Sequence, residues 1–138
     1  MSPRNPSLEQ VFRATRYVIL GPPELVLVPG ERSGALLRLH ADCGVQASGL
    51  VTAWNPHARR LAPHENDAAQ ARLARSLAAA GWRTRPAEHR TPQGDWDEPS
   101  FWVAGIERAA LEALGRQYGQ AAVLHAGANA TAHLCWLE

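Results

Sequence analysis

Two short segments place polar side chains between aromatic and turn-forming residues, where a carboxylate or an amide can do chemistry. Residues 52–56 read TAWNP and residues 94–101 read GDWDEPSF. In the second segment Glu98 stands between Trp96 and an apolar strand, so we expect its carboxyl group to be partly withdrawn from water. A desolvated carboxylate needs a partner or a raised pKa, and both are common at functional sites. Glu98 is therefore the candidate general acid or base.

Amide, hydroxyl and indole side chains complete the candidate site. Asn66 lies seven positions before Leu73 on a predicted helix, so it shares the buried stripe of that helix. Amides offer a donor and an acceptor, which suits recognition of a neutral polar edge in a nucleotide or amino-acid derivative. Ser100 has no evident histidine partner, so any turnover would be water-mediated hydrolysis or proton transfer rather than covalent catalysis. The candidate ligand-binding residues are Asn55, Asn66, Ser100, Gln120, Trp54 and Trp96.

The same residues also have structural explanations, and the sequence leaves both interpretations open. Asn55 before a proline can satisfy a turn, since asparagine side chains bond their own backbone. Gln120 can cap carbonyl groups at a helix end, and Glu98 can form a buried ion pair with Arg72 or an arginine of residues 83–85. In this second interpretation the polar cluster only fixes the fold, and the protein is a non-enzymatic interaction module. Whether the chain is an enzyme is undecided.

No metal site or other cofactor is predicted. His125, His133 and Cys135 of a predicted hairpin could hold zinc, but strand residues of these types are far more often packed, and tetrahedral ligand spacing is lacking. Cys43 and Cys135 are expected to be reduced, half-buried strand residues, because the chain shows no apolar secretion signal.

Charge and hydropathy narrow the classes of partner. The net charge is +1 and all 14 basic residues are arginine, so the chain lacks the excess of positive charge typical of nucleic-acid-binding proteins. No apolar run is long enough for a membrane span. Local basic residues are Arg83, Arg85, His89 and Arg90, with Arg59 and Arg60 as a second pair, and they indicate either a solvated strand edge or an anion site. We expect a cytoplasmic protein with a small polar ligand, and a homodimer stays open.

The elements that would position these residues follow from apolar spacing and turn residues. A short helix is predicted from Ser7 to Ala14 in the N-terminal arm 1–14, and long helices over 63–80 and 107–118. Strands are predicted at 17–20, 25–28, 35–40, 48–54, 82–86, 101–104, 121–125 and 133–137. Strand pairs between helices predict a single α+β domain, 1–138, with a mixed or mainly antiparallel sheet of five or more strands and helices on one face.

Four motifs in this order resemble a bacterial family known as domain of unknown function 3293. They are T-A-W-N-P at 52–56, E-N at 65–66, G-x-W-x-E-P-S-F at 94–101, and G-R-x-[FY]-G-Q-x-A at 115–122. The resemblance extends over residues 15 to 138 and implies a small bacterial protein without an assigned activity. The family tends to place serine before the E-N helix, where this chain has Ala62 and Pro63, so no catalytic role belongs to that position.

Overall fold

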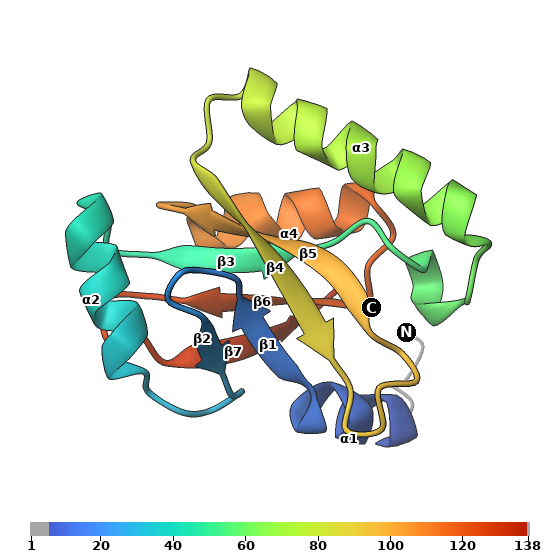
Figure 1. Ribbon diagram of the computed structural model, residues 1–138, viewed down its shortest axis with the longest axis horizontal. Coiled ribbons are helices and arrows are strands. Elements are labelled where there is room, and N and C mark those ends of the chain that lie inside the picture. The colour runs from blue at the N-terminus through green and yellow to red at the C-terminus, as the bar shows by residue number, and fades with distance from the viewer. Residues whose placement is uncertain (1–5, 138) are drawn as a thin grey trace.

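An antiparallel sheet of seven strands runs through the molecule (Figure 1). The computed structural model describes residues 6–137, and in this range the strands follow the order β2-β1-β4-β5-β3-β6-β7. The strands are β1 (Arg16–Ile19), β2 (Leu25–Leu27), β3 (Ser48–Val51), β4 (Thr84–Arg90), β5 (Glu98–Ala104), β6 (Ala122–Ala126) and β7 (Ala132–Trp136). The helices are α1 (Pro6–Ala14), α2 (Gly34–Cys43), α3 (Pro63–Ala79) and α4 (Arg108–Gln117), with a short 3-10 helix η1 (Pro56–Ala58). The predicted α+β domain with a mainly antiparallel sheet is confirmed.

The predicted helices around 7–14, 63–80 and 107–118 correspond to α1, α3 and α4. Proline begins α3, and Glu65 in its first turn lies near the exposed backbone N–H groups. Asn66, Leu73 and Leu77 form part of its buried stripe, whereas Ala80, predicted to be buried, is exposed at the helix end. The spacing of apolar residues therefore located the helices that carry the strongest 3.6-residue periodicity.

The predicted strand at 35–40 is wrong, because this segment lies in helix α2. Ser33 caps the helix by accepting a hydrogen bond from Leu36 N at 3.0 Å. Gly44 ends it in the left-handed conformation, with φ of 69°. Leu36, Leu39 and His40 are buried at i, i+3 and i+4, which is helical spacing. Cys43 consequently ends a helix instead of lying in a strand.

Helices cover both faces of the sheet, which corrects the prediction that they pack on one face. Leu73 of α3 and Leu111 of α4 belong to a core with Val103, whereas Leu36 of α2 belongs to a second core with Trp102. Neighbouring strand residues point to opposite faces. Helix α2 therefore packs on the face opposite α3 and α4, which lie together on one side of the sheet (Figure 1).

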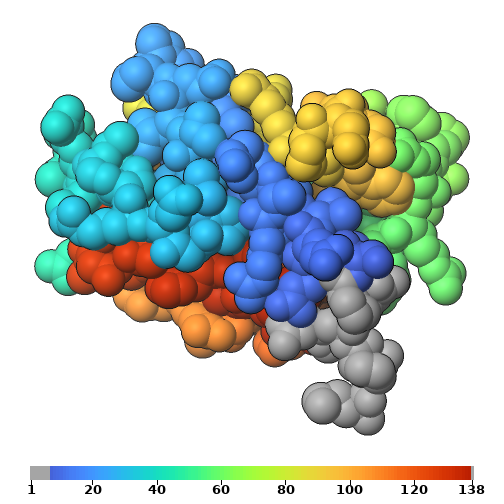
Figure 2. Space-filling view, turned by 90° about the horizontal axis from the view of Figure 1, so that it is seen from below, coloured from blue at the N-terminus to red at the C-terminus, as the bar shows by residue number. Residues whose placement is uncertain are grey.

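Helix α1 lies beside the loop 91–97 at one end of the sheet (Figure 2). It is fixed there by the ring of Phe12, whose centroid is 5.1 Å from that of Trp136. The backbone carbonyl of Phe12 also accepts a hydrogen bond from the Tyr17 hydroxyl at 2.9 Å. Since Tyr17 is on β1, these contacts hold the helix against the sheet and form one wall of a cavity.

Candidate functional site

A row of three polar or aromatic side chains crosses neighbouring strands at this end of the sheet. Tyr17 of β1 is paired with His89 of β4, and His89 is paired with Glu98 at the start of β5. Directly paired residues project from the same face. The Tyr17 and His89 rings meet edge to face at 4.8 Å between centroids, and His89 Nδ1 lies 3.9 Å from Glu98 Oε1. The strand register thus puts Glu98 in line with two rings.

Two asparagines hold the other side of Glu98. Asn55 Nδ2 donates to Glu98 Oε2 at 2.8 Å. Asn66 Nδ2 in turn donates to Asn55 Oδ1 at 2.8 Å, and Asn66 Oδ1 accepts from the Asn55 backbone N–H at 2.8 Å. Asn55 Oδ1 also accepts from Leu61 N at 2.9 Å. The expected approach of a sequence-distant amide to Glu98 is observed for Asn55, whose amide nitrogen is fixed toward the carboxyl group.

The turn that carries Asn55 has an uncommon backbone. Asn55, His57 and Ala58 all have positive φ, at 47°, 59° and 56°. Asparagine tolerates this region, but alanine and histidine are strained there by about 1 to 3 kcal/mol each. His57 N donates to the carbonyl of Gly119 at 2.7 Å, so the turn rests on the end of α4. Such strain is commonly found where a structure must present a particular side chain.

Burial sets the protonation state of Glu98 and His89. Burial raises the pKa of Glu98 to about 7, and hydrogen bonds from Asn55 and Trp96 and the charge of Arg60 only partly oppose this shift. Burial lowers the pKa of His89 to about 4. Near neutral pH His89 is therefore uncharged and Glu98 is close to half protonated, so the contact at 3.9 Å is not a permanent ion pair.

The cation that acts on Glu98 is not one that the sequence suggested. Its hydrogen bond goes to Asn55, and Arg60 supplies the opposing charge, instead of Arg72 or an arginine of residues 83–85. The Arg83 side chain instead donates to the carbonyl of Cys43. The ion-pair interpretation with those arginines is therefore wrong.

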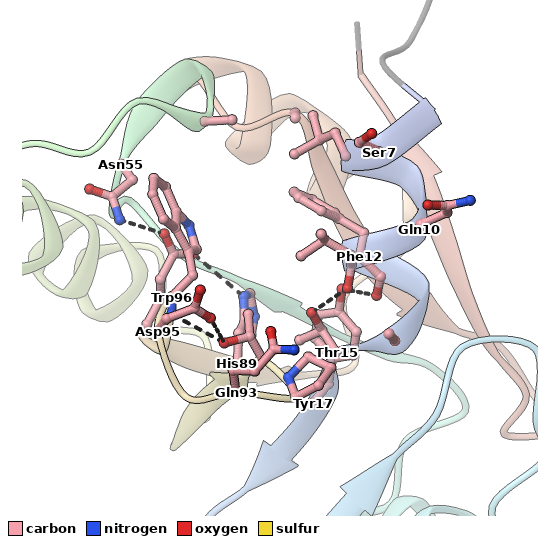
Figure 3. A pocket seen from close by; sticks show the side chains of 18 of the residues that line it. Ser7, Gln10, Phe12, Thr15, Tyr17, Asn55, His89, Gln93, Asp95 and Trp96 are labelled. Atoms are coloured by element: carbon pink, nitrogen blue, oxygen red, sulfur yellow. Dashed lines mark hydrogen bonds and ion pairs between the residues drawn. The ribbon is translucent and has the colours of Figure 1, made fainter.

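Glu98 lies at a cavity of about 550 Å3 between α1 and the loop 91–97 (Figure 3). Figure 3 shows Phe12 and Tyr17 on one side of the opening and Trp96 on the other, with His89 between them. Asn55, Glu98, Gln120 and Trp96 of the predicted site line this space. The arrangement combines aromatic walls with a few buried polar groups, which is the usual composition of a small-molecule site.

Three predicted residues do not line the cavity. Asn66 lies one hydrogen bond behind Asn55, Ser100 Oγ donates to the Val51 carbonyl at 3.0 Å inside the sheet, and Trp54 is not part of the lining. Gln120 lines the cavity, but its Nε2 donates to backbone carbonyl groups, including that of Trp54 at 3.1 Å. The helix-end role considered for Gln120 and its place at the cavity therefore coexist.

The sequence did not reveal the rest of the lining. His89 was grouped with neighbouring arginines as a basic segment, yet strand alternation separates it from Arg90 and Glu88, which bond each other at 2.8 Å. Only the register of β4 with β5 brings His89 beside Glu98. Tyr17 and helix α1 become part of the cavity lining only because β1 pairs with β4, and no local sequence pattern indicates this pairing.

The potential metal ligands and the helices of the described residues show neither a metal cluster nor a membrane span. Among residues 6–137, no group of three or more His, Cys, Asp or Glu side chains is placed to hold a metal ion. His125 does face His133 across the β6–β7 hairpin, as expected, but its Nε2 bonds the Ile106 carbonyl at 2.9 Å. Cys43 and Cys135 are free. Within the same described range, no helix has the length and apolarity to cross a membrane.

Comparison with known proteins gives one match. A family model described as "Protein of unknown function (DUF3293)" matches residues 51–123, which is more than half of the chain and includes all four motifs. No curated protein and no solved structure matches the chain.

Proposed function

The chain belongs to the DUF3293 family of proteins of unknown function, and on that premise we propose that it binds a small polar ligand in the cavity between α1 and loop 91–97. The single observation that carries the proposal is Glu98, a carboxyl group only 9% exposed that borders a cavity of about 550 Å3. Ligand pockets range over about 300–1,000 Å3. The location is taken to be cytoplasmic, and a homodimer stays a prediction.

The electrostatics of Glu98 support a ligand-contacting role. Burying a carboxyl group without a strong cationic partner is unfavourable for the folded protein, and such groups are frequent at functional sites. The partner here is the neutral amide of Asn55, so Glu98 keeps the ability to gain or lose a proton near pH 7. A ligand group would meet a carboxyl that can either accept or donate a hydrogen bond. In any turnover, Glu98 would serve as general acid or base.

The aromatic side chains support a ligand with a flat body. Phe12, Tyr17 and Trp96 all line the cavity. Aromatic walls contribute a large apolar contact area at low entropic cost. Gln120 and His89 add polar atoms beside Glu98. Ser100 and Trp54, which do not line the space, are not assigned to the ligand, and Asn66 is assigned to orienting Asn55.

The alternative, a purely structural cluster in an interaction module, predicts a different outcome. Asn55 and Asn66 do fix the turn, and their bonds need no ligand. The large exposed apolar residues of the described chain are Val11 and Val26, which do not form a broad apolar surface. The alternative therefore requires that the cavity binds no ligand, and a ligand screen can decide between the two functions.

A fragment screen by ligand-observed NMR tests the proposal. Wild type is compared with Glu98→Gln, which keeps the side-chain shape, and with Glu88→Gln, which removes a half-buried carboxylate on the neighbouring strand that bonds Arg90. We expect fragments whose signals respond to wild type and Glu88→Gln and lose at least about tenfold in affinity for Glu98→Gln. The proposal fails if no fragment binds, or if every fragment binds the three proteins equally.

A further inference from the structure

We infer that the cavity selects a ligand with a cationic or strongly donating nitrogen group, such as an amidine or an amino-heterocycle, on a flat aromatic body. This inference rests on the proposed function and specifies its ligand class. It differs from the broader expectation of a nucleotide, because a phosphate group would need cations or backbone N–H donors that point into the site.

The charges around the cavity favour a cation. Its acidic lining residues are Asp95 and Glu98, and among the described lining residues there is no arginine, while the chain has no lysine. The nearby Arg60 does not line the cavity: its Nη2 donates to the Asp95 carbonyl at 2.7 Å, and its charge acts on Glu98 from outside the lining. His89 is uncharged near neutral pH because burial lowers its pKa. An anion would therefore enter a cavity lined by two carboxyl groups and by no arginine or lysine side chain.

Among Asn55, Gln120 and Glu98, the hydrogen-bonding atoms that remain for a ligand are mainly acceptors. The Asn55 amide is fully engaged, with Nδ2 on Glu98 and Oδ1 on Asn66 and Leu61. Gln120 Nε2 is bonded to carbonyl groups, which leaves its Oε1 as the available side-chain atom. The Glu98 carboxyl group accepts hydrogen bonds from Asn55 and Trp96, and a carboxylate has further lone pairs with which to accept one from a ligand. A carboxyl group and an amide oxygen that line one cavity suit an amidinium or aminopyridine edge.

The aromatic walls suit a planar cation in particular. The guanidinium carbon of Arg60 lies 4.2 Å from the centroid of the Trp96 ring, so this indole already contacts one flat cation, and Arg60 is not among the residues that line the cavity. Phe12 and Tyr17 present further aromatic surface to the cavity. The negative face of an aromatic ring attracts a cation, more strongly where water is excluded. Shape and charge thus select the same ligand class.

A cationic ligand would also couple binding to the ionisation of Glu98. The titratable or charged groups around Glu98 are His89 on β4, Tyr17 on β1, and Asp95 and Arg60 in the loops. Because the free carboxyl has a pKa of about 7, a cation must first find it ionised or displace its proton. Affinity should rise about tenfold from pH 6 to pH 8. A ligand that accepts a hydrogen bond from the protonated carboxyl should show the opposite trend.

Three probes of nearly equal shape separate the charge classes: benzamidine, benzamide and benzoate. Binding is measured by calorimetry or NMR at pH 6 and pH 8 to wild type, Glu98→Gln and Glu88→Gln. We expect benzamidine to bind best, to gain about tenfold at pH 8, and to lose both the affinity and the pH effect in Glu98→Gln but not in Glu88→Gln.

Several results would overturn the inference. Benzoate or benzamide binding as tightly as benzamidine would exclude a cation-selective site, yet would leave the proposed function standing if Glu98→Gln reduced that binding. If benzamidine bound wild type and Glu98→Gln with equal affinity, the cation would bind at a place other than Glu98. If none of the three probes binds, the ligand class is wrong, and the separate fragment screen decides whether the cavity binds any ligand.

Discussion

Replacing Glu98 by glutamine should raise the free energy of unfolding, and this gain over wild type should grow as the pH rises. The folded state holds a proton on Glu98 that the unfolded chain has already released, because the carboxyl pKa is raised from 4.5 to about 7. Because of this group, the free energy of unfolding of the wild type falls as the pH increases from 4.5 to 7. Glutamine is neutral throughout, and its carbonyl oxygen can still accept the hydrogen bond from Asn55 Nδ2.

The size of the effect follows from this pKa difference. The free-energy cost of ionisable Glu98 in the folded state is below about 1 kcal/mol at pH 5 and reaches about 3 kcal/mol at pH 8. His89 acts in the opposite direction, because its lowered pKa reduces stability as the pH falls from 6.5 toward 4. The wild-type curve alone therefore combines two groups, and the difference between variant and wild type isolates Glu98.

Urea denaturation at pH 5, 6, 7 and 8 measures this difference. The free energy of unfolding of Glu98→Gln minus that of wild type should grow by about 2 kcal/mol across the series. The control Glu88→Gln removes a carboxylate that is 40% exposed, and should shift all pH points by less than about 1 kcal/mol. A variant less stable than wild type by about 3 kcal/mol at pH 8 would refute this account, since that loss is expected when a buried cation is left unpaired.

Two further substitutions, each compared with a control variant elsewhere in the chain, test how the turn of residues 55–58 is held. Asn66→Ala removes both hydrogen bonds to Asn55 and should cost about 2 to 4 kcal/mol in urea denaturation, whereas Asn129→Ala in an exposed turn should cost less than about 1 kcal/mol. Gly119→Ala should cost more than Gly44→Ala by about 1 kcal/mol or more, because both have φ near 68° but only at Gly119 does an added Cβ lie within 3.0 Å of another residue. Equal losses within either pair would contradict this description of the turn.

The sequence predicted elements whose periodicity is strong and failed where two patterns compete. Helices α3 and α4 show apolar residues at helical spacing over several turns, so their approximate bounds could be predicted. The segment 35–40 is short and rich in leucine, and such a run fits a buried strand or a helix equally well. Ser33 caps the start of this segment and Gly44 ends it, and these two residues favour the helix. The apolar residues alone do not reveal either signal.

The site was predictable only in its local part. Glu98, Asn55 and Trp96 stand out because polar residues among tryptophans and turn-formers are unusual in one segment. Asn66 followed from its place on the buried stripe, and it is 1% exposed. His89 and Tyr17 could not be inferred in the same way, because strand order and register depend on contacts across the whole sheet. Ser100 shares the face of Glu98 by alternation on β5, but it does not line the cavity and its hydroxyl is bonded to the Val51 carbonyl.

The four family motifs meet at one turn, which gives them a shared physical purpose. Asn55 of the first motif is held by Asn66 of the second and bonds Glu98 of the third. The fourth motif supports the same turn through the Gly119 carbonyl and the Gln120 side chain. An arginine in place of the Asn55 amide would keep Glu98 permanently ionised. A rigid but neutral donor instead leaves the carboxyl able to change its protonation state, so the hydrogen-bond network that holds the turn is also what the proposed ligand site requires.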